Sequence, residues 1–505
     1  MGTDCFEVKP QSIADKRPKN HQKAFNILKS RKSMKVVFLS PPQNDKIFPS
    51  LGIAYLTAVL NKEGHQASLH DGANSSIKEM VNYVDRASPQ VVGITMNTTN
   101  RFEALELARI IKSRFKIPII VGGPHPTLLP DQLLRNYSFI DFIIRNEAEH
   151  TIVKLINALE KREDYSKILG ISFKRNNEII HNPPAPIIEN LDDLPFPEWR
   201  FFNLKKYIPQ TEYPEEYKNS YFGSIITSRG CPFRCTFCSS SNFWGYKIRF
   251  RSAESILEEI KMLYNLGVRF IVFNDDNFTS NKKRAIEVCN LIIQEGLHEK
   301  MGWQCRAEVN IVDEELLSIM KKANCNMIEF GIEDCTEEGI RWFKKSHIMP
   351  QVKTAFDLCK KYNIKIKSYF IVGGDHETKE NLALKKKYME ELDPDVTTAS
   401  ILLAYPKTEI FEYGKQKGLW TEDIWLKNLV GEKYHSNAPI YTGPHLTYSE
   451  ISAASATILH SWMKKKGYYK ISDSIKIAIN LFKKGDFNKL AVMSMAVAKQ
   501  KIRGD

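Results

Sequence analysis

Hydrophobic and polar positions follow two alternating periods along most of the chain. Apolar runs at 34–40, 91–96 and 117–121, and extended segments at 66–70 and 140–145, are typical of strands. Residues 53–63, 77–86, 102–115 and those from 149 onward carry apolar side chains at helical spacing. Strands that alternate with helices predict a doubly wound parallel sheet with helices on both faces. We therefore expect an α/β domain over residues 34–165.

The carboxyl ends of these strands are the expected ligand site, because open parallel sheets bind ligands there. Small and polar residues gather at these ends. The candidate contacts are Pro42, Thr95, Gly122, Gly123 and Glu147.

A second alternation of strands and helices runs from 223 to 418. Strands are expected at 224–229, 269–274, 302–308, 327–332, 366–372 and 396–403, each followed by a helical pattern. Six such units predict a partial, open (β/α)6 barrel with its site on the carboxyl-terminal rim.

The remaining segments depart from both alternations. Residues 1–33 are predicted to form a basic, flexible arm, and 166–222 a hairpin and a proline-interrupted linker. Residues 419–505 are expected to form a helical cap near the substrate, with helices at 449–465, 471–483 and 487–503. Packing on the core is the favoured interpretation of the basic tail helices, and peripheral contact with a membrane surface is the alternative.

Composition narrows the setting. The net charge of +13 is spread along the chain outside its two ends, which favours a solvated basic surface, so no nucleic-acid partner is expected. Uncharged apolar runs are too short for a transmembrane helix. The nine cysteines form one tight triplet and six scattered singles, which is not a disulfide framework and favours the cytoplasm.

The cysteine triplet is the strongest chemical signal in the sequence. Cys231, Cys235 and Cys238 follow an apolar run and Gly230 within a short loop. Three thiols do not complete a tetrahedral zinc site, and their spacing differs from that of ferredoxin clusters. A four-iron cluster held by three cysteines keeps one iron open for a reactant. Ordinary buried cysteines and part of a zinc site are the alternatives.

This Cys-x3-Cys-x2-Cys loop, with Phe237 before the third cysteine, closely resembles that of radical S-adenosylmethionine (SAM) enzymes. The resemblance implies a 4Fe–4S cluster whose open iron binds the methionine part of SAM. It also implies that one electron from the cluster cleaves SAM to a 5′-deoxyadenosyl radical.

The resemblance extends to the ends of the later barrel strands. Residues 273–277 resemble the stretch that holds the SAM amino group, and 330–334 the stretch beside its methionyl group and ribose. Residues 403–409 resemble a Tyr-Pro-Gly-Thr motif with Lys407 in place of glycine, and Arg306 is suited to a carboxylate. The expected SAM-site residues are Asp275, Asp276, Asn277, Arg306, Glu308, Gly331, Glu333, Gly373, Gly374 and Tyr405. For each residue alone, a structural turn or ion pair is the competing interpretation.

The amino-terminal half resembles the cobalamin-binding domain that precedes one branch of radical SAM enzymes. The resemblance rests on residues 48–60, 91–95, 121–125 and 144–149. The Asp-x-His-x-x-Gly motif that supplies an axial histidine is absent, and 145–149 read Arg-Asn-Glu-Ala-Glu instead of Arg-Gly-Glu-Gly-Glu. The resemblance therefore implies cobalamin bound without a protein imidazole on cobalt, with His70 and His125 as candidate rim contacts.

Three functions follow as hypotheses. The first is cobalamin-dependent methylation of an unactivated carbon, the kind of site that acid–base chemistry does not activate. The second is a radical cyclisation, carbon–carbon coupling or rearrangement of the tetrapyrrole, hopanoid or lipid type. The third is a non-catalytic cobalamin sensor or assembly protein. The enzyme hypotheses imply a small-molecule or lipid-like substrate and a reductant such as flavodoxin or ferredoxin.

Overall fold

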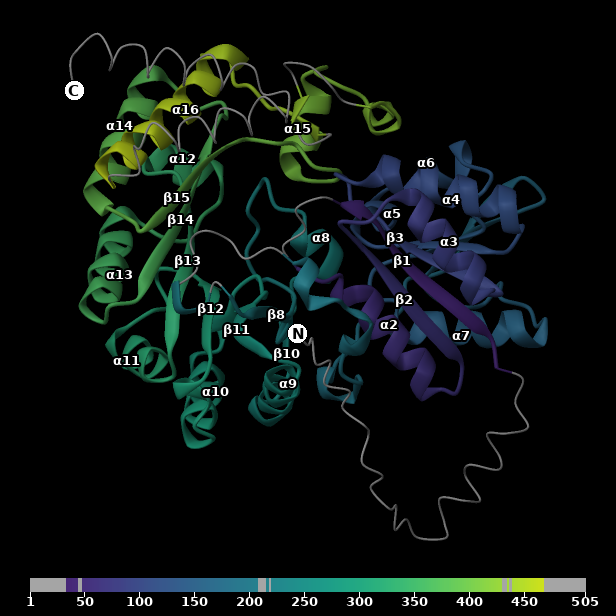
Figure 1. Ribbon diagram of the computed structural model, residues 1–505. Helices are drawn as coiled ribbons and strands as arrows, with labels where there is room; N and C mark the ends of the chain where they lie inside the picture. The colour runs from purple at the N-terminus through teal and green to yellow at the C-terminus, as the bar shows by residue number, and fades with distance from the viewer. Residues whose placement is uncertain are drawn as a thin grey trace, which may run out of the picture.

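The computed structural model describes residues 33–43, 48–207, 215–217, 219–428, 434–435 and 438–466. Two α/β units lie side by side, with the short helix α8 (Ser240–Trp244) between them (Figure 1). One apolar core is continuous from the inner face of the first sheet to the helices around the second. The two units are therefore packed together over an apolar interface.

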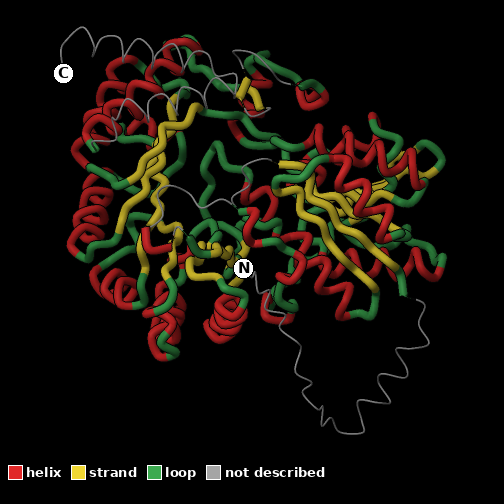
Figure 2. The backbone as a smooth tube through the Cα atoms, viewed as in Figure 1, coloured by secondary structure: helices red, strands yellow, loops and turns green. Residues whose placement is uncertain are grey.

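The amino-terminal unit is an open sheet with helices on both faces (Figure 2). The sheet order is β2-β1-β3-β4-β5-β6-β7; the first five strands are parallel and the last two antiparallel. The strands are β1 (Lys35–Gln43), β2 (Gln66–Ala73), β3 (Val91–Thr95), β4 (Ile119–Gly122), β5 (Phe142–Ile144), β6 (Ile171–Arg175) and β7 (Glu178–His181). The helices are α2 (Leu51–Lys62), α3 (Ile77–Ala87), α4 (Arg101–Phe115), α5 (Pro124–Leu128), α6 (Pro130–Asn136) and α7 (Glu149–Lys161). The predicted doubly wound sheet is confirmed, and the predicted hairpin extends it.

Strand β1 continues through two prolines. Its register against β2 shifts between Ser40 and Gln43, where Pro41 and Pro42 lack the N–H that a regular ladder needs. Pro42 is therefore part of the strand itself, whereas the sequence suggested that the strand ends at the prolines.

The second unit is a curled parallel sheet in the order β15-β14-β13-β12-β11-β8. Its strands are β8 (Tyr221–Ile225), β11 (Val268–Phe273), β12 (Gly302–Ala307), β13 (Cys325–Glu333), β14 (Lys365–Val372) and β15 (Val396–Ile401). Its helices are α9 (Ala253–Asn265), α10 (Lys282–Gln294), α11 (Glu314–Lys322), α12 (Glu337–Trp342), α13 (Met349–Lys361), α14 (Lys379–Leu392) and α15 (Glu409–Gln416). The predicted partial barrel is confirmed. The single strand expected at 224–229 is instead β8 followed by β9 (Ser228–Arg229), and β9 pairs with β10 (Arg249–Phe250).

The last described helix, α16 (Tyr448–Lys465), begins at a capping box in which Thr447 and Glu450 bond each other's backbone N–H. It packs on β15 and α14, and Trp462 Nε1 donates to Pro394 O at 3.0 Å. None of the helices in the described ranges is long and apolar enough to cross a membrane. The tail helices expected at 471–483 and 487–503, and nearly all of the arm at 1–33, lie outside the described residues.

Candidate functional site

The cysteine loop runs from β9 to α8 at the carboxyl end of the barrel strands. Gly230 permits the turn into it, because its φ is +100° and an added Cβ would lie 2.2 Å from Lys247 O. The backbone around Thr236 is held on both sides: its N–H donates to Phe343 O at 3.3 Å, and its carbonyl accepts from Ile410 N at 3.2 Å. The loop is therefore fixed by residues far away in the sequence.

The three thiols fit a metal cluster. Cys231, Cys235 and Cys238 are half-buried, and Ser240 N–H donates to Cys238 Sγ at 3.4 Å. Without a metal, burial raises the pKa of Cys231 to about 12 and that of Cys235 to about 11. The positive charge of Lys345 lowers the pKa of Cys235 and Cys238, and a bound metal ion would also lower it.

The other described cysteines are buried in the apolar core. They are Cys289, Cys305, Cys325, Cys335 and Cys359. Burial raises the pKa of Cys289 and Cys305 far above that of a free thiol, so these groups stay protonated. These five cysteines come from separate segments of the barrel, whereas Cys231, Cys235 and Cys238 share one half-buried loop.

Two neighbouring aspartates after β11 have different environments. Asp275 is buried, and its carboxylate accepts from Thr227 N at 2.7 Å, Thr227 Oγ1 at 2.6 Å and Ser228 N at 2.6 Å. Asp276 is exposed, but nearby protein desolvates its carboxyl enough to raise its pKa, and Ser240 Oγ donates to it. Asp275 thus holds the residues that lead into the cysteine loop, whereas the Asp276 side chain is exposed.

We predict that Asp275→Asn lowers thermal stability and the retention of iron. The change removes the charge from hydrogen bonds worth about 1.5–3 kcal/mol each. Asp276→Asn is the matched control, because it makes the same change one residue away without touching β9. Thermal unfolding and iron assays of the two variants check this. Equal behaviour of the two would contradict the assigned role of Asp275.

Polar side chains from β12, β13 and β14 form a wall around Glu329 inside the barrel. Glu329 accepts from Gln304 Nε2 at 2.8 Å, from Tyr369 OH at 2.7 Å and from Arg306 Nε at 3.3 Å. Arg306 also donates to Asn274 Oδ1 at 3.1 Å and stays partly exposed. Asn277 is buried, and its Nδ2 has no hydrogen-bond partner within the described ranges. Arg306 and Asn277 thus retain donor capacity for a ligand.

A lysine that the sequence did not single out joins two predicted residues. The buried Lys345 Nζ lies 3.1 Å from Glu308 Oε1, and its charge also acts on Glu333. Glu333 is buried in a left-handed conformation, with φ of +63°. Burial raises the pKa of Glu333 to about 7 despite the opposing effect of Lys345. A Cβ on Gly331 would lie 2.4 Å from Glu333 Oε1, so a larger residue there would displace this carboxyl.

The two glycines after β14 are packed against the protein itself. Gly373 and Gly374 have φ of +122° and +117°. Cβ atoms added there would meet Leu402 and Tyr441 O, or His376 and Trp342, at 2.9–3.1 Å. Tyr405 is half-buried, which raises the pKa of its hydroxyl. The glycines are therefore required by internal packing, whatever they contact in a complex.

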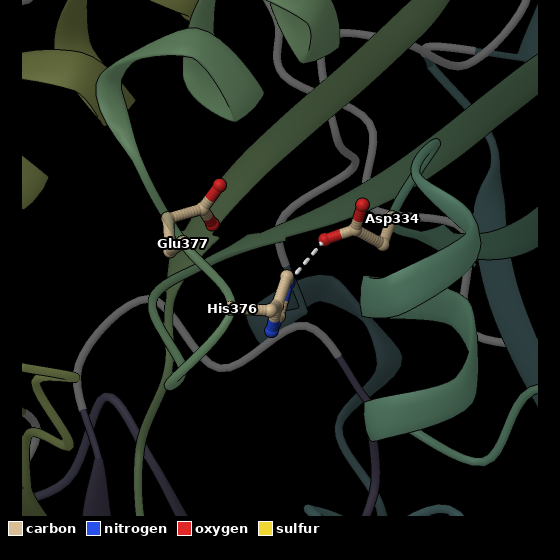
Figure 3. Close-up of side chains that lie close together, drawn as sticks. All are labelled: Asp334, His376 and Glu377. Atoms are coloured by element: carbon tan, nitrogen blue, oxygen red, sulfur yellow. Dashed lines mark hydrogen bonds and ion pairs between the residues drawn. The ribbon is translucent and has the colours of Figure 1, made fainter. Parts of the chain in front are cut away.

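Asp334, His376 and Glu377 come together behind these strand ends (Figure 3). His376 Nε2 lies 2.8 Å from Asp334 Oδ2, and all three side chains are buried. Lys385 Nζ lies 2.7 Å from Asp334 Oδ2 and also pairs with Glu377. The Lys385 ammonium group balances the charge of these carboxylates as a metal ion would, so the cluster is a buried ion-pair network.

A largely apolar cavity of about 100 Å³ opens at the carboxyl edge of the amino-terminal sheet. Four predicted contacts line it together: Thr95, Gly122, Gly123 and Glu147. Phe243 and Trp244 of α8 close it from the barrel side, and Pro42 is not among its lining residues. Within the described ranges, a glycine-lined apolar recess at this edge fits part of a large planar cofactor such as a corrin.

The two candidate histidines lie outside this cavity lining. His125 is buried, with Nδ1 3.1 Å from Thr98 Oγ1, and burial lowers its pKa to about 3. His70 packs against the ring of Tyr83. Neither is placed as a ligand of a group bound in the cavity.

Glu147 also has a role that the sequence did not reveal. Its carboxylate lies 2.9 Å from Arg229 NH1 and 2.6 Å from Arg249 NH1, and it accepts from Ile188 N at 2.8 Å. Glu149 lies 2.5 Å from Arg229 NH2. These buried pairs join the sheet domain to residues on both sides of the cysteine loop.

Comparisons with known proteins agree with this geometry. Residues 45–156 match the B12 binding domain, and residues 225–385 match the Radical SAM superfamily. The chain is 33% identical over 432 residues to the "Uncharacterized methyltransferase PH0819" of Pyrococcus horikoshii, covering 83% of this chain and 90% of the relative. It is 29% identical to the anaerobic magnesium-protoporphyrin IX monomethyl ester cyclase of Cereibacter sphaeroides, covering 75% of this chain and 63% of the relative. The fold is similar to that of the cobalamin-dependent SAM radical enzyme OxsB, with a TM-score of 0.69 at 18% identity over 97% of this chain and 75% of OxsB.

The cysteine loop on a partial parallel barrel defines a radical SAM enzyme. With its amino-terminal sheet and cavity, the chain belongs to the radical SAM enzymes that carry a B12-binding domain.

Proposed function

We propose that this enzyme transfers a methyl group from SAM to an unactivated carbon of a small-molecule substrate, using a 4Fe–4S cluster and cobalamin. The observation that carries the proposal is the shared wall between the two sites. The cavity of the B12-binding domain is closed by α8, which directly follows the cysteine loop. When bound, the cluster supplies the electron that cleaves one SAM, and the corrin carries the methyl group taken from another.

The residues of this chain have distinct roles in the proposal. Cys231, Cys235 and Cys238 hold the cluster. Asp276, Asn277, Arg306 and Glu333 follow or lie near the barrel strand ends and bind SAM, whose ammonium and sulfonium charges favour the carboxylates. The set proposed for the SAM site also includes Asp275, Glu308, Gly331, Gly373, Gly374 and Tyr405, which position these groups.

We predict that SAM affinity rises with pH in the window around the pKa of Glu333. This carboxyl is largely neutral below about pH 7 and ionised above it, and only the ionised form attracts the positive charges of SAM. Glu333→Gln should bind SAM about tenfold more weakly at pH 8, because one charge-assisted hydrogen bond is lost, and its affinity should not change between pH 6 and 8. Asp276→Asn is the control: it should bind more weakly at each pH but keep the wild-type slope. Equilibrium dialysis with labelled SAM measures this, and an unchanged slope in Glu333→Gln would exclude Glu333 as the titrating contact.

The reaction also needs an electron donor and a substrate. We propose a flavodoxin-like or ferredoxin-like reductant in the cytoplasm. We also propose a small-molecule or lipid-like substrate on the barrel rim, where Glu329, Arg306 and Tyr369 form the polar wall. The tail at 467–505 is the proposed place of any contact with a membrane surface.

A second candidate function is radical cyclisation without methyl transfer. The 29% identity to the protoporphyrin ester cyclase supports it. The two functions differ in the fate of SAM: methylation gives 5′-deoxyadenosine and S-adenosylhomocysteine, whereas cyclisation without methyl transfer gives no S-adenosylhomocysteine.

The test is anaerobic incubation of the reconstituted enzyme with SAM and dithionite, with and without hydroxocobalamin. The proposal expects 5′-deoxyadenosine in both reactions and S-adenosylhomocysteine only with the corrin. 5′-Deoxyadenosine without corrin-dependent S-adenosylhomocysteine would favour cyclisation. Absence of both products would favour a non-catalytic sensor.

A further inference from the structure

One loop of the B12-binding domain grips the cysteine loop at both of its ends. The loop comprises residues 146–149, which follow β5 and end at the first residue of α7. At the entrance to the cysteine loop, Glu147 and Glu149 hold Arg229, two residues before Cys231. At the exit, Asn146 Nδ2 donates to Phe243 O at 2.9 Å, in the helix that follows Cys238.

Arg249 adds a further connection between the loop at 146–149 and the cysteine loop. Its guanidinium donates to Glu147 Oε2 at 2.6 Å and to Trp244 O at 3.2 Å, so it connects residues 146–149 to the end of α8. Arg229 in turn lies over the ring of Trp244 at 5.0 Å and over that of Tyr55 at 5.5 Å. Entrance, exit and the loop at 146–149 are thus one connected set of contacts.

The charges in this set are buried and balanced. The side chains of Arg229, Arg249, Glu147 and Glu149 are 2–7% exposed, and two cations face two carboxylates. Breaking a buried pair by removing one partner is costly because the other charge is left without compensation. The position of Arg229 is therefore tied to that of the loop at 146–149.

The same loop is a wall of the cavity. Asn146, Glu147, Ala148 and Glu149 line it on one side, and Phe243 and Trp244 on the other. A ligand in the cavity therefore touches the residues that fix both ends of the cysteine loop. Ordering either side reduces the entropy that remains to be lost when the other side is ordered.

We infer that Arg229 is a positioning residue that couples the corrin cavity to the cluster loop, so that corrin and cluster strengthen each other's binding. The inference rests on the proposed function, since it takes the cavity ligand to be a corrin. Coupling between two sites is reciprocal: the factor by which the cluster tightens corrin binding equals the factor by which corrin tightens cluster binding.

The experiment measures hydroxocobalamin affinity in the full-length protein, with the cluster reconstituted and after its removal by chelation. The test variant is Arg229→Gln with Glu149→Gln, which removes one buried pair without leaving a single charge and keeps the Glu147–Arg249 pair. The control is Arg251→Gln with Glu259→Gln, a buried pair of the same kind that does not line the cavity. Arg229→Lys is included because it keeps the charge.

The wild type is expected to bind hydroxocobalamin at least about fivefold more tightly with the cluster than without it. The ratio should fall to about one in Arg229→Gln/Glu149→Gln, persist in the control and recover in part in Arg229→Lys. In the reciprocal readout, hydroxocobalamin should slow the loss of iron to a chelator only where the ratio exceeds one. A ratio of one in the wild type, or a wild-type ratio in Arg229→Gln/Glu149→Gln, would overturn the inference while leaving the proposed function intact. Failure of every form to bind hydroxocobalamin would overturn the proposed function as well.

Discussion

Replacing Cys231, Cys235 or Cys238 with alanine is expected to abolish SAM cleavage and to remove the iron–sulfur absorption. The three thiols share one loop, whose backbone at Thr236 is held by hydrogen bonds to Phe343 and Ile410. A cluster with three protein ligands has no spare one, and the loss of a ligand removes the site. The effect should be complete for each of the three, as measured by iron content, absorption spectrum and release of 5′-deoxyadenosine.

Cys289→Ala is the matched control for these variants. Cys289 is fully buried on α10, where burial holds its thiol in the protonated form. The variant should lose some stability from the vacated volume but keep its iron. Iron loss in Cys289→Ala equal to that of the loop variants would show that the chain holds metal at a second place and that the assignment of the loop is incomplete.

Filling the cavity of the B12-binding domain is expected to weaken corrin binding without disturbing the cluster. Gly122 and Ile120 lie on the same face of β4, and both line the cavity. A Cβ at Gly122 would meet only Ile144 O at 3.6 Å, an ordinary contact, so a larger side chain fits the fold and occupies the ligand space. Gly122→Leu should weaken hydroxocobalamin binding by at least about tenfold, which corresponds to about 1.4 kcal/mol.

Gly122→Ala provides the graded comparison, because it adds one methyl group to the same wall. Its corrin affinity should fall between those of the wild type and Gly122→Leu, and iron content and 5′-deoxyadenosine formation should stay close to wild type in both. Wild-type corrin affinity in Gly122→Leu, with the fold intact by thermal unfolding, would place the corrin elsewhere on the protein.

Most of the fold could be predicted from the alternation of strand and helix periods, and the centre of the site from the spacing of the cysteines. Each strand–helix unit leaves its own local signal, and the three cysteines lie within one short loop. The hairpin at 171–181 was expected in the linker, but it pairs with β5 and extends the first sheet. The hairpin sequence alone does not predict which strand the hairpin pairs with, because that depends on residues elsewhere in the chain.

Contacts between residues that meet only in the folded chain could not be predicted from the sequence. Arg229 and Glu147 are separated by 82 positions, and nothing local marks them as partners. Glu147 was predicted as a cofactor contact because it follows a strand end. It lines the cavity, and it also belongs to an ion-pair network between the domains. Lys345 escaped notice because a lysine in a basic stretch gives no sign that it will be buried beside the cysteine loop.

The aspartates after β11 show a finer limit. The sequence does not distinguish Asp275 from Asp276, but the Asp275 carboxylate is buried against β9 and the Asp276 side chain is exposed. Neighbouring residues in extended backbone point to opposite sides, so the choice between support and ligand depends on the strand's rotation in the barrel. Local sequence does not encode that rotation.

A chain that holds a cluster and a corrin at a common wall should retain both after reconstitution. The chain is purified without oxygen, supplied with iron, sulfide and hydroxocobalamin, freed of unbound cofactor, and analysed for iron and corrin per polypeptide. We expect about four irons and about one corrin per chain, with the iron lost in Cys235→Ala and the corrin content lowered in Gly122→Leu. Iron without corrin, or zinc in place of iron, would refute this arrangement.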